Sequence, residues 1–195
     1  MQTQTRTLTK LCRHIMVATI TATLFISVGA SADDTRVNIS EERQRVQQVL
    51  NAYHGVQLKD LVAAANDPQA HLLEMLDETA TRPLTRLQAL AALAHFPNKA
   101  TRSVYLDIIK KADHKDRGSR ELHRAIQGLA FGFGEAAAEQ IEPLLKHKDV
   151  QVRLTAVDAM SKLGAGAKVT LRDHLKTEKH PLVLESIIEK APAVR

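Results

Sequence analysis

The segment Asp149–Gly164, DVQVRLTAVDAMSKLG, predicts a helix with an unusually wide apolar surface. Asp149 is a good N-cap residue, because its carboxylate can accept hydrogen bonds from first-turn amides. Gly164 suits the left-handed conformation that commonly follows a helix. At about 100° per residue, the apolar residues cover roughly 220°, and the polar ridge that remains consists of Gln151, Thr155, Asp158 and Lys162. An ordinary surface helix has a narrower apolar stripe, so this helix must be covered on several sides.

Internal repetition explains how one helix can be covered on several sides. Residues 133–146 (FGEAAAEQIEPLLK) align without gaps on residues 163–176 (LGAGAKVTLRDHLK). Residues 124–130 and 88–94 each align on 155–161, and small residues recur one helical turn apart in all three segments. Each unit therefore consists of two helices, and stacking of units buries both flanks of the second helix.

The residues that carry a family resemblance lie in the segment Leu144–Gly164, and they are Asp149, Val152, Arg153, Ala156, Ala159, Leu163 and Gly164. This pattern resembles the HEAT family, in particular the short bacterial HEAT-like repeats first noticed in phycobilisome lyase proteins. The resemblance implies an all-α fold, a right-handed α-solenoid of about four helix pairs with an extra N-terminal helical segment. It also implies that Asp149 and Arg153 bridge consecutive repeats, and Arg86 aligns with Arg153.

The first 32 residues are typical of a cleaved secretory signal peptide. Arg6, Lys10 and Arg13 precede an apolar run over residues 15–30, and Ala30-Ser31-Ala32 offers small residues at the cleavage site. We expect cleavage after Ala32 and a periplasmic or secreted protein. An uncleaved anchor is the alternative, although the apolar run is short for a membrane span.

The mature chain of 195 − 32 = 163 residues is long enough for one domain with a real core. We expect a helical capping segment over 33–66, a HEAT-like repeat domain over 67–191, and a tail over 192–195. Helix start and stop signals predict helices, besides the one that follows Asp149, over 41–53, 68–78, 83–96, 100–112, 120–133, 135–146, 168–176 and 182–191.

No recognisable catalytic or metal-binding motif occurs in the chain. The His-Glu dipeptides of HEAT-type di-iron hydroxylases and the zinc motif His-Glu-x-x-His are both missing. The single cysteine, Cys12, lies in the signal segment. Residues 113–118 (DHKDRG) lack the acid spacing of a calcium loop, so we interpret them as an exposed loop, with a weak metal site as the alternative. We expect no metal, no cofactor and no enzymatic activity; an enzyme with an unrecognised site is the remaining alternative.

Charge and aromatic content argue against nucleic acid as the partner. Of 27 Lys and Arg residues, three belong to the signal segment, which leaves 27 − 3 = 24 against 22 Asp and Glu. A groove that binds extruded bases needs stacking aromatics, and the chain has no Trp and two Tyr. We therefore expect a protein or peptide partner, and no membrane insertion after signal cleavage.

Stacked helix pairs present a continuous surface built from equivalent positions of their second helices. Extended through the alignment, the polar ridge predicts the partner-binding residues Gln88, His95, Arg120, Arg124, Gln127, Phe131, Gln151, Thr155, Asp158 and Lys162. The expected function is an exported protein–protein interaction scaffold that binds a protein or peptide on this face. An accessory subunit or assembly factor of an envelope enzyme is the alternative, and any single ridge residue can also be merely solvated.

Phe131 allows two interpretations. It aligns with Lys162 on the outer ridge, where an exposed aromatic beside Arg124 and Gln127 has the composition of an interface anchor. Alternatively, the extra residue in FGFG (131–134), which we interpret as a glycine-rich helix end, turns Phe131 into the core.

Overall fold

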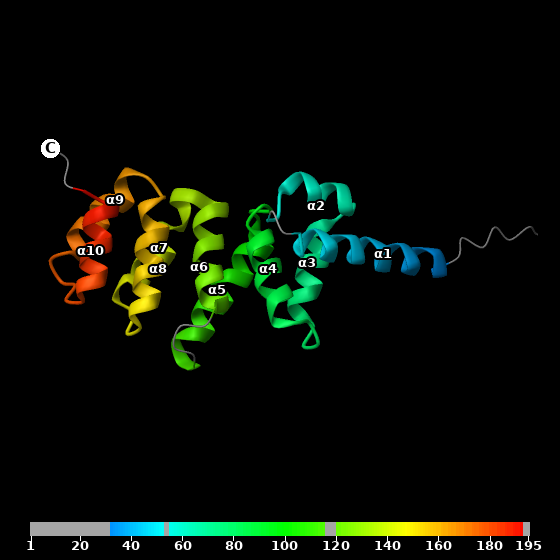
Figure 1. The fold of residues 1–195 in the computed structure, drawn as a ribbon, viewed down its shortest axis with the longest axis horizontal. Helices are drawn as coiled ribbons and strands as arrows, with labels where there is room; N and C mark the ends of the chain where they lie inside the picture. The colour runs from blue at the N-terminus through cyan, green and yellow to red at the C-terminus, as the bar shows by residue number, and fades with distance from the viewer. Residues whose placement is uncertain (1–31, 53–54, 116–119, 193–195) are drawn as a thin grey trace, which may run out of the picture.

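The computed structural model describes residues 32–52, 55–115 and 120–192, and all regular structure in these ranges is helical. The expected all-α class is therefore confirmed. The helices follow one another along the long axis of the molecule, from α1 (Ala32–Leu50) at one end to α10 (Pro181–Lys190) at the other (Figure 1). The expected signal peptide lies outside the described residues, apart from Ala32. In the described ranges, no helix combines the length and the apolarity that a membrane span requires.

The helices pack in pairs and in a row. Helix α3 packs on α4, α5 on α6, and α9 on α10, while α8 packs on the segment that precedes it. The second helix of each pair also contacts the second helix of the next pair: α4 contacts α6, α6 contacts α8, and α8 contacts α10. The bounds are α2 (Leu58–Ala64), α3 (Pro68–Asp77), α4 (Pro83–Leu93), α5 (Lys99–Lys115), α6 (Arg120–Phe133), η1 (Gly134–Ala137), α7 (Ala138–Ile141), η2 (Glu142–Lys146), α8 (Val150–Ser161) and α9 (Ala165–His174).

Helix α8 has the N-terminal cap and the wide buried surface that the sequence predicts. The Asp149 carboxylate accepts a hydrogen bond of 2.8 Å from the Gln151 amide. The helix ends at Ser161, and Gly164, with a φ of 104° and a ψ of −169°, lies just before α9 instead of directly after α8. The apolar arc of α8 is buried, with Val152, Ala156, Val157, Ala159 and Met160 at most 1% exposed. The surrounding helices thus cover every side of α8 except the polar ridge.

Positions that align between units share their environments. Gly134 and Gly164, which are 30 residues apart, both have a positive φ. Ile141 and its counterpart Leu171 are fully buried. Alanine occupies the tightest positions of the second helices, and the equivalent residues Ala89, Ala125 and Ala156 are completely buried.

The predicted continuous helix over 135–146 is wrong, because the chain forms η1, α7 and η2 there. Pro143 lacks an amide hydrogen and its ring clashes with the carbonyl four residues earlier, which breaks an α-helix. The sequence analysis also missed α2, a helix of only seven residues whose N-cap Gln57 makes no capping hydrogen bond. Such a helix depends on packing rather than on local signals.

Two further helices begin or end elsewhere than expected. Helix α1 begins at Ala32 rather than after Ser40, because residues 33–40 contain no Pro or Gly and begin with two aspartates, which favour a helix N-terminus. Helix α5 ends at Lys115, three residues inside the expected loop over 113–118; no Gly or Pro interrupts the chain before Gly118. The other predicted helices agree within three residues.

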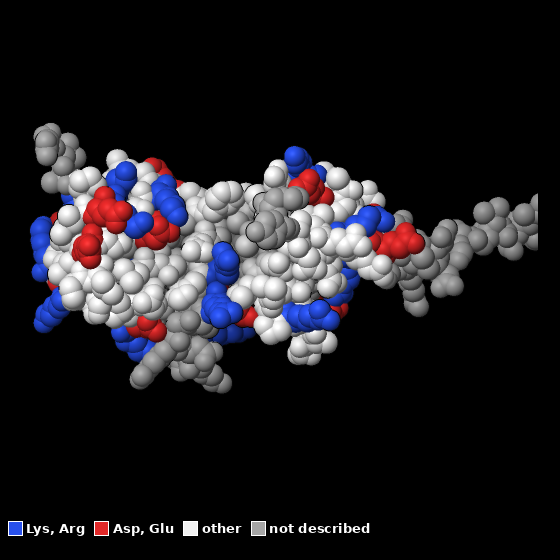
Figure 2. All heavy atoms as spheres, viewed as in Figure 1, with Lys and Arg blue, Asp and Glu red and all other residues white. Residues whose placement is uncertain are grey.

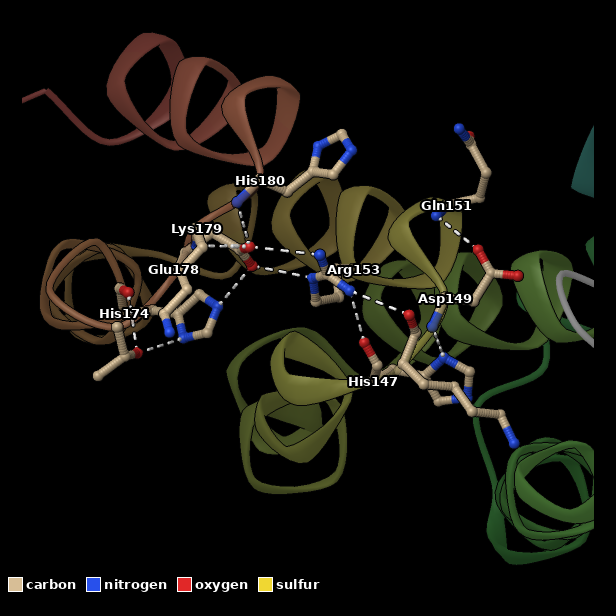
Figure 3. A network of polar contacts seen from close by, with 10 residues as sticks. His147, Asp149, Gln151, Arg153, His174, Glu178, Lys179 and His180 are labelled. Carbon is tan, nitrogen blue, oxygen red and sulfur yellow. Dashed lines mark hydrogen bonds and ion pairs between the residues drawn. The ribbon is translucent and has the colours of Figure 1, made fainter.

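Arg153 of α8 joins three segments of the chain through one buried guanidinium group (Figure 3). It donates to the backbone carbonyls of His147, at 2.8 Å, and Lys148, at 3.3 Å, which end the preceding segment. It also forms a two-point ion pair with Glu178, at 2.9 and 3.3 Å, in the loop between α9 and α10. Both side chains are largely buried, with 14% of Arg153 and 6% of Glu178 exposed. The position of α8 is therefore fixed relative to the segment that precedes it and to the loop between α9 and α10.

Arg86 makes the equivalent contacts in an earlier unit. From α4 it donates to the Leu76 carbonyl near the end of α3 and to the Glu121 carboxylate, at 3.1 Å, in the first turn of α6. A polar contact also connects α5 with η1, since Arg102 of α5 donates to the carbonyl of Ala136 at 2.6 Å. Polar contacts thus join neighbouring helices on both sides of α6.

The Glu178 carboxylate is held strongly in its ionised form. Burial by itself would raise its pKa, but hydrogen bonds from the His180 amide, the Arg153 side chain and the Lys179 amide outweigh burial. The result is a pKa lowered from an ordinary value of 4.5 to about 2. The folded state therefore favours the charged carboxylate.

Close approach of α6 to its neighbours depends on two glycines spaced four residues apart. A Cβ atom on Gly128 would lie 2.5 Å from Cζ of the buried Tyr105 ring, and one on Gly132 would lie 2.9 Å from the Ala94 carbonyl oxygen. The Tyr105 ring cannot easily move, because its hydroxyl donates to the Leu90 carbonyl at 2.7 Å. Glycine at position 128 thus lets α4, α5 and α6 meet.

Gly128→Ala is expected to destabilise the protein by about 1–3 kcal/mol, the usual effect of overpacking a core, even though alanine is the better helix former. Gly166→Ala in α9 is the matched control, because a Cβ there meets nothing within 4 Å, and it should not lower stability. Urea unfolding followed by circular dichroism measures both. Equal stabilities of the two variants would contradict the close packing at Gly128.

Glu178 is expected to make stability pH-dependent in the acid range. Because its pKa is about 2 in the folded protein and near 4.5 in the unfolded chain, its stabilisation is complete above pH 5 or so and is lost as the pH falls from 4.5 towards 2. Glu178→Gln should lower the melting temperature at pH 7 and flatten its fall between pH 5 and 3. Glu185→Gln, at an exposed position of α10, should leave the dependence of the melting temperature on pH as in the wild type. If Glu178→Gln also shows the wild-type dependence, Glu178 is not the source of the acid destabilisation.

Candidate partner-binding face

Helices α4 and α6 enclose a hollow on the side of the molecule that carries the predicted ridge. This α4–α6 hollow has a volume of about 440 Å³. Its walls are mainly apolar, with a few polar side chains among them. Its lining residues from the two helices are Leu84, Leu87, Gln88, Ala91, Ala94, His95, Arg124, Gln127, Gly128 and Phe131.

Phe131 stands at the edge of this hollow and is 70% exposed. The interpretation of Phe131 as a core residue is therefore wrong. Helix α6 continues to Phe133, so the extra residue of FGFG does not rotate Phe131 inwards. The ring packs edge-on against His95, with ring centroids 5.5 Å apart and an interplanar angle of 79°. An apolar ring is thus largely presented to solvent beside His95.

A second hollow lies on the other side of Phe131, between α6 and α8. This α6–α8 hollow has a volume of about 540 Å³ and is lined by Gln127, Ala130, Phe131, Gly134, Asp158, Ala159 and Lys162. Phe131 and Gln127 belong to both hollows. The two hollows and the ring between them therefore form one continuous face across three helices, which we call the α4–α6–α8 face.

Asp158 is the acidic group of this face, and two lysines neutralise it. Lys162 lies 2.7 Å away on the same helix, and Lys190 reaches it from α10 at 2.9 Å. Burial would raise the pKa of Asp158, but the hydrogen bonds from the two lysines outweigh burial and lower it. Asp158 is thus ionised and already paired, and its contact with Lys190 links α8 to α10.

The structure brings seven of the ten predicted ridge residues together around the two hollows. Gln88, His95, Arg124, Gln127 and Phe131 line the first hollow, and Asp158 and Lys162 extend the set into the second. Three predicted residues line neither hollow. Arg120 and Gln151 lie in the first turns of α6 and α8, and Thr155 donates to the Gln151 carbonyl at 2.9 Å.

The sequence analysis missed one wall of the α4–α6 hollow. Leu50 and Ala52, at the end of α1, and Gly55 and Val56, in the chain that follows, line the hollow together with α4 and α6. Gly55 has a φ of +83°, and this glycine was the only local signal of a turn. The N-terminal segment thus closes the hollow at one end.

Charged side chains gather towards the two ends of the molecule in Figure 2, and uncharged atoms dominate its middle, apart from one column of basic side chains. In the described ranges, no group of three or more His, Cys, Asp or Glu side chains is arranged to hold a metal ion. By its lining residues, the α4–α6–α8 face offers apolar contact surface together with hydrogen-bonding and basic groups.

Comparison with known proteins assigns no family to this chain: no family model matches it, and no curated protein is significantly similar to it in sequence.

Proposed function

We propose that this chain is an exported helical-repeat scaffold that holds a segment of a partner protein along the α4–α6–α8 face. The exposure of Phe131 between two hollows carries this proposal. Large aromatic residues at the centre of a contact surface dominate binding energies in many interfaces. With 70% of its side chain exposed, Phe131 is accessible to a partner, and the flanking hollows give the partner places for its own side chains.

The scaffold proposed here is a right-handed α-solenoid of HEAT-like repeats. The units are α3 with α4, α5 with α6, the segment η1–η2 with α8, and α9 with α10, and α1 and α2 form the N-terminal cap. Support comes from the equivalent contacts of Arg86 and Arg153, and from the shared environments of Gly134 and Gly164. Repeat scaffolds of this kind use one continuous face for binding.

Because we propose that this chain is exported, its partner also lies outside the cytoplasm. This part of the proposal rests on the charged start, the apolar run and the small residues at 30–32. Binding is proposed because the α4–α6–α8 face combines two hollows with an exposed aromatic ring. Gln88, His95, Arg124 and Gln127 are suited to orienting a bound segment.

Phe131→Ala is expected to keep the melting temperature of the wild type and to weaken binding of the natural partner by roughly 2 kcal/mol, as for an interface anchor. Ile188→Ala is the matched control, since Ile188 on α10 is also exposed, at 60%, but lies off the α4–α6–α8 face. Quantitative co-purification from the producing cell, with thermal melts of each variant, measures both effects. Equal recovery of partners by the two variants would contradict the proposed face.

A further inference from the structure

We infer that the segment bound on the α4–α6–α8 face carries an acidic side chain a few residues from a large apolar one. This inference rests on the proposed function and specifies its partner. It follows from the arrangement of side chains along α6. Arg124, Gln127 and Phe131 line the same side of the helix, with the basic group at one end and the apolar ring at the other.

Arg124 is a basic group that is free to bind a carboxylate. It is exposed, and its hydrogen bond is a long one of 3.3 Å to the Gln127 amide oxygen. No carboxylate of the described ranges lies within ion-pair distance of Arg124 or of Arg120, one turn earlier on α6. In contrast, Arg43, Arg86 and Arg153 all have carboxylate partners. An external carboxylate would supply the two-point partner that a guanidinium group prefers.

The α6–α8 hollow adds to the positive balance of the face. Asp158 contributes one negative charge, but Lys162 and Lys190 both contact it, which leaves one positive charge in excess. With Arg124, which lines the α4–α6 hollow, the basic groups around the face outnumber the acidic ones. An approaching acidic segment is therefore attracted, and a basic one is repelled.

Apolar contacts are available at a fixed distance from Arg124. Leu84 is 64% exposed, and together with Leu87, Ala91 and Phe131 it offers the apolar part of the α4–α6 hollow. Phe131 is two turns from Arg124, roughly 10 Å along the helix. An extended chain advances about 3.3 Å per residue, so the acidic and apolar side chains of the partner should be about two to four positions apart.

A peptide satisfies these requirements better than an acidic polysaccharide does. A polyanion would use the arginines but would leave the Phe131 ring and the apolar hollow exposed. A peptide segment can fill the hollow with an aliphatic or aromatic side chain and still place a carboxylate on Arg124. The proposed occupant is therefore an acidic, apolar segment of a protein.

The inference can be tested without knowing the natural partner. A library of random 12-residue peptides is selected on the purified protein, and the dissociation constants of the enriched peptides are measured by fluorescence anisotropy. Arg124→Gln and Phe131→Ala should each weaken binding about tenfold or more. Lys99→Gln is the charge control, since Lys99 is exposed at the start of α5, and it should change binding less than twofold or so. Changing the peptide's acid to its amide should abolish the difference between wild type and Arg124→Gln.

Each other outcome contradicts a definite part of the account. Enriched peptides that lack acids, or that tolerate Arg124→Gln as well as Lys99→Gln, would overturn this inference. The proposed function would stand if such peptides still needed Phe131. If the selection yields no peptide whose binding depends on Phe131, both the inference and the proposed function are overturned. Heparin binding that is weakened by Arg124→Gln but not by Phe131→Ala would assign the face to an acidic polysaccharide and also overturn the inference.

Discussion

The Arg153 guanidinium group connects α8 to the segment before it and to the loop before α10, in addition to the packing between these helices. It holds the carbonyls that end η2 on one side and the Glu178 carboxylate of the next unit on the other. Charge-assisted, two-point hydrogen bonds of this kind have strict geometry. Because Arg86 makes the equivalent contacts to Leu76 and Glu121, the same interaction sets the relation between units twice, and it aligns α4, α6 and α8 on one side of the molecule.

Small residues bring these aligned helices close enough to form one surface. Ala89, Ala125 and Ala156 are fully buried at equivalent places, and Gly128 leaves room for the Tyr105 ring. Since the contacts between second helices use their small and apolar sides, the polar side of each helix remains outside. The α4–α6–α8 face is thus a consequence of how the units stack, and Phe131 is exposed because it occupies an outer position in that arrangement.

The sequence predicted the features that depend on local signals and repetition. Asp149 caps the start of α8, and alignment between units gave the outer position of Phe131 as one of two interpretations. The break at Pro143 is a local effect, which the predicted helix over 135–146 failed to take into account. Two contacts were beyond this reasoning: Val56 lines the α4–α6 hollow from a distant segment, and Glu178 meets Arg153 across 25 residues. Such contacts depend on how the helices stack, which local sequence patterns do not encode.

A double-mutant cycle on Arg153 and Glu178 tests most directly whether the arginine contacts couple consecutive units. Unfolding free energies are measured by chemical denaturation for wild type, Arg153→Met, Glu178→Gln and the double variant. A buried, two-point pair predicts that the single changes are not additive, with a coupling energy of about 1–3 kcal/mol. A coupling energy within about 0.3 kcal/mol of zero would show that the two groups do not act together, and would contradict the account of how the face is held in place.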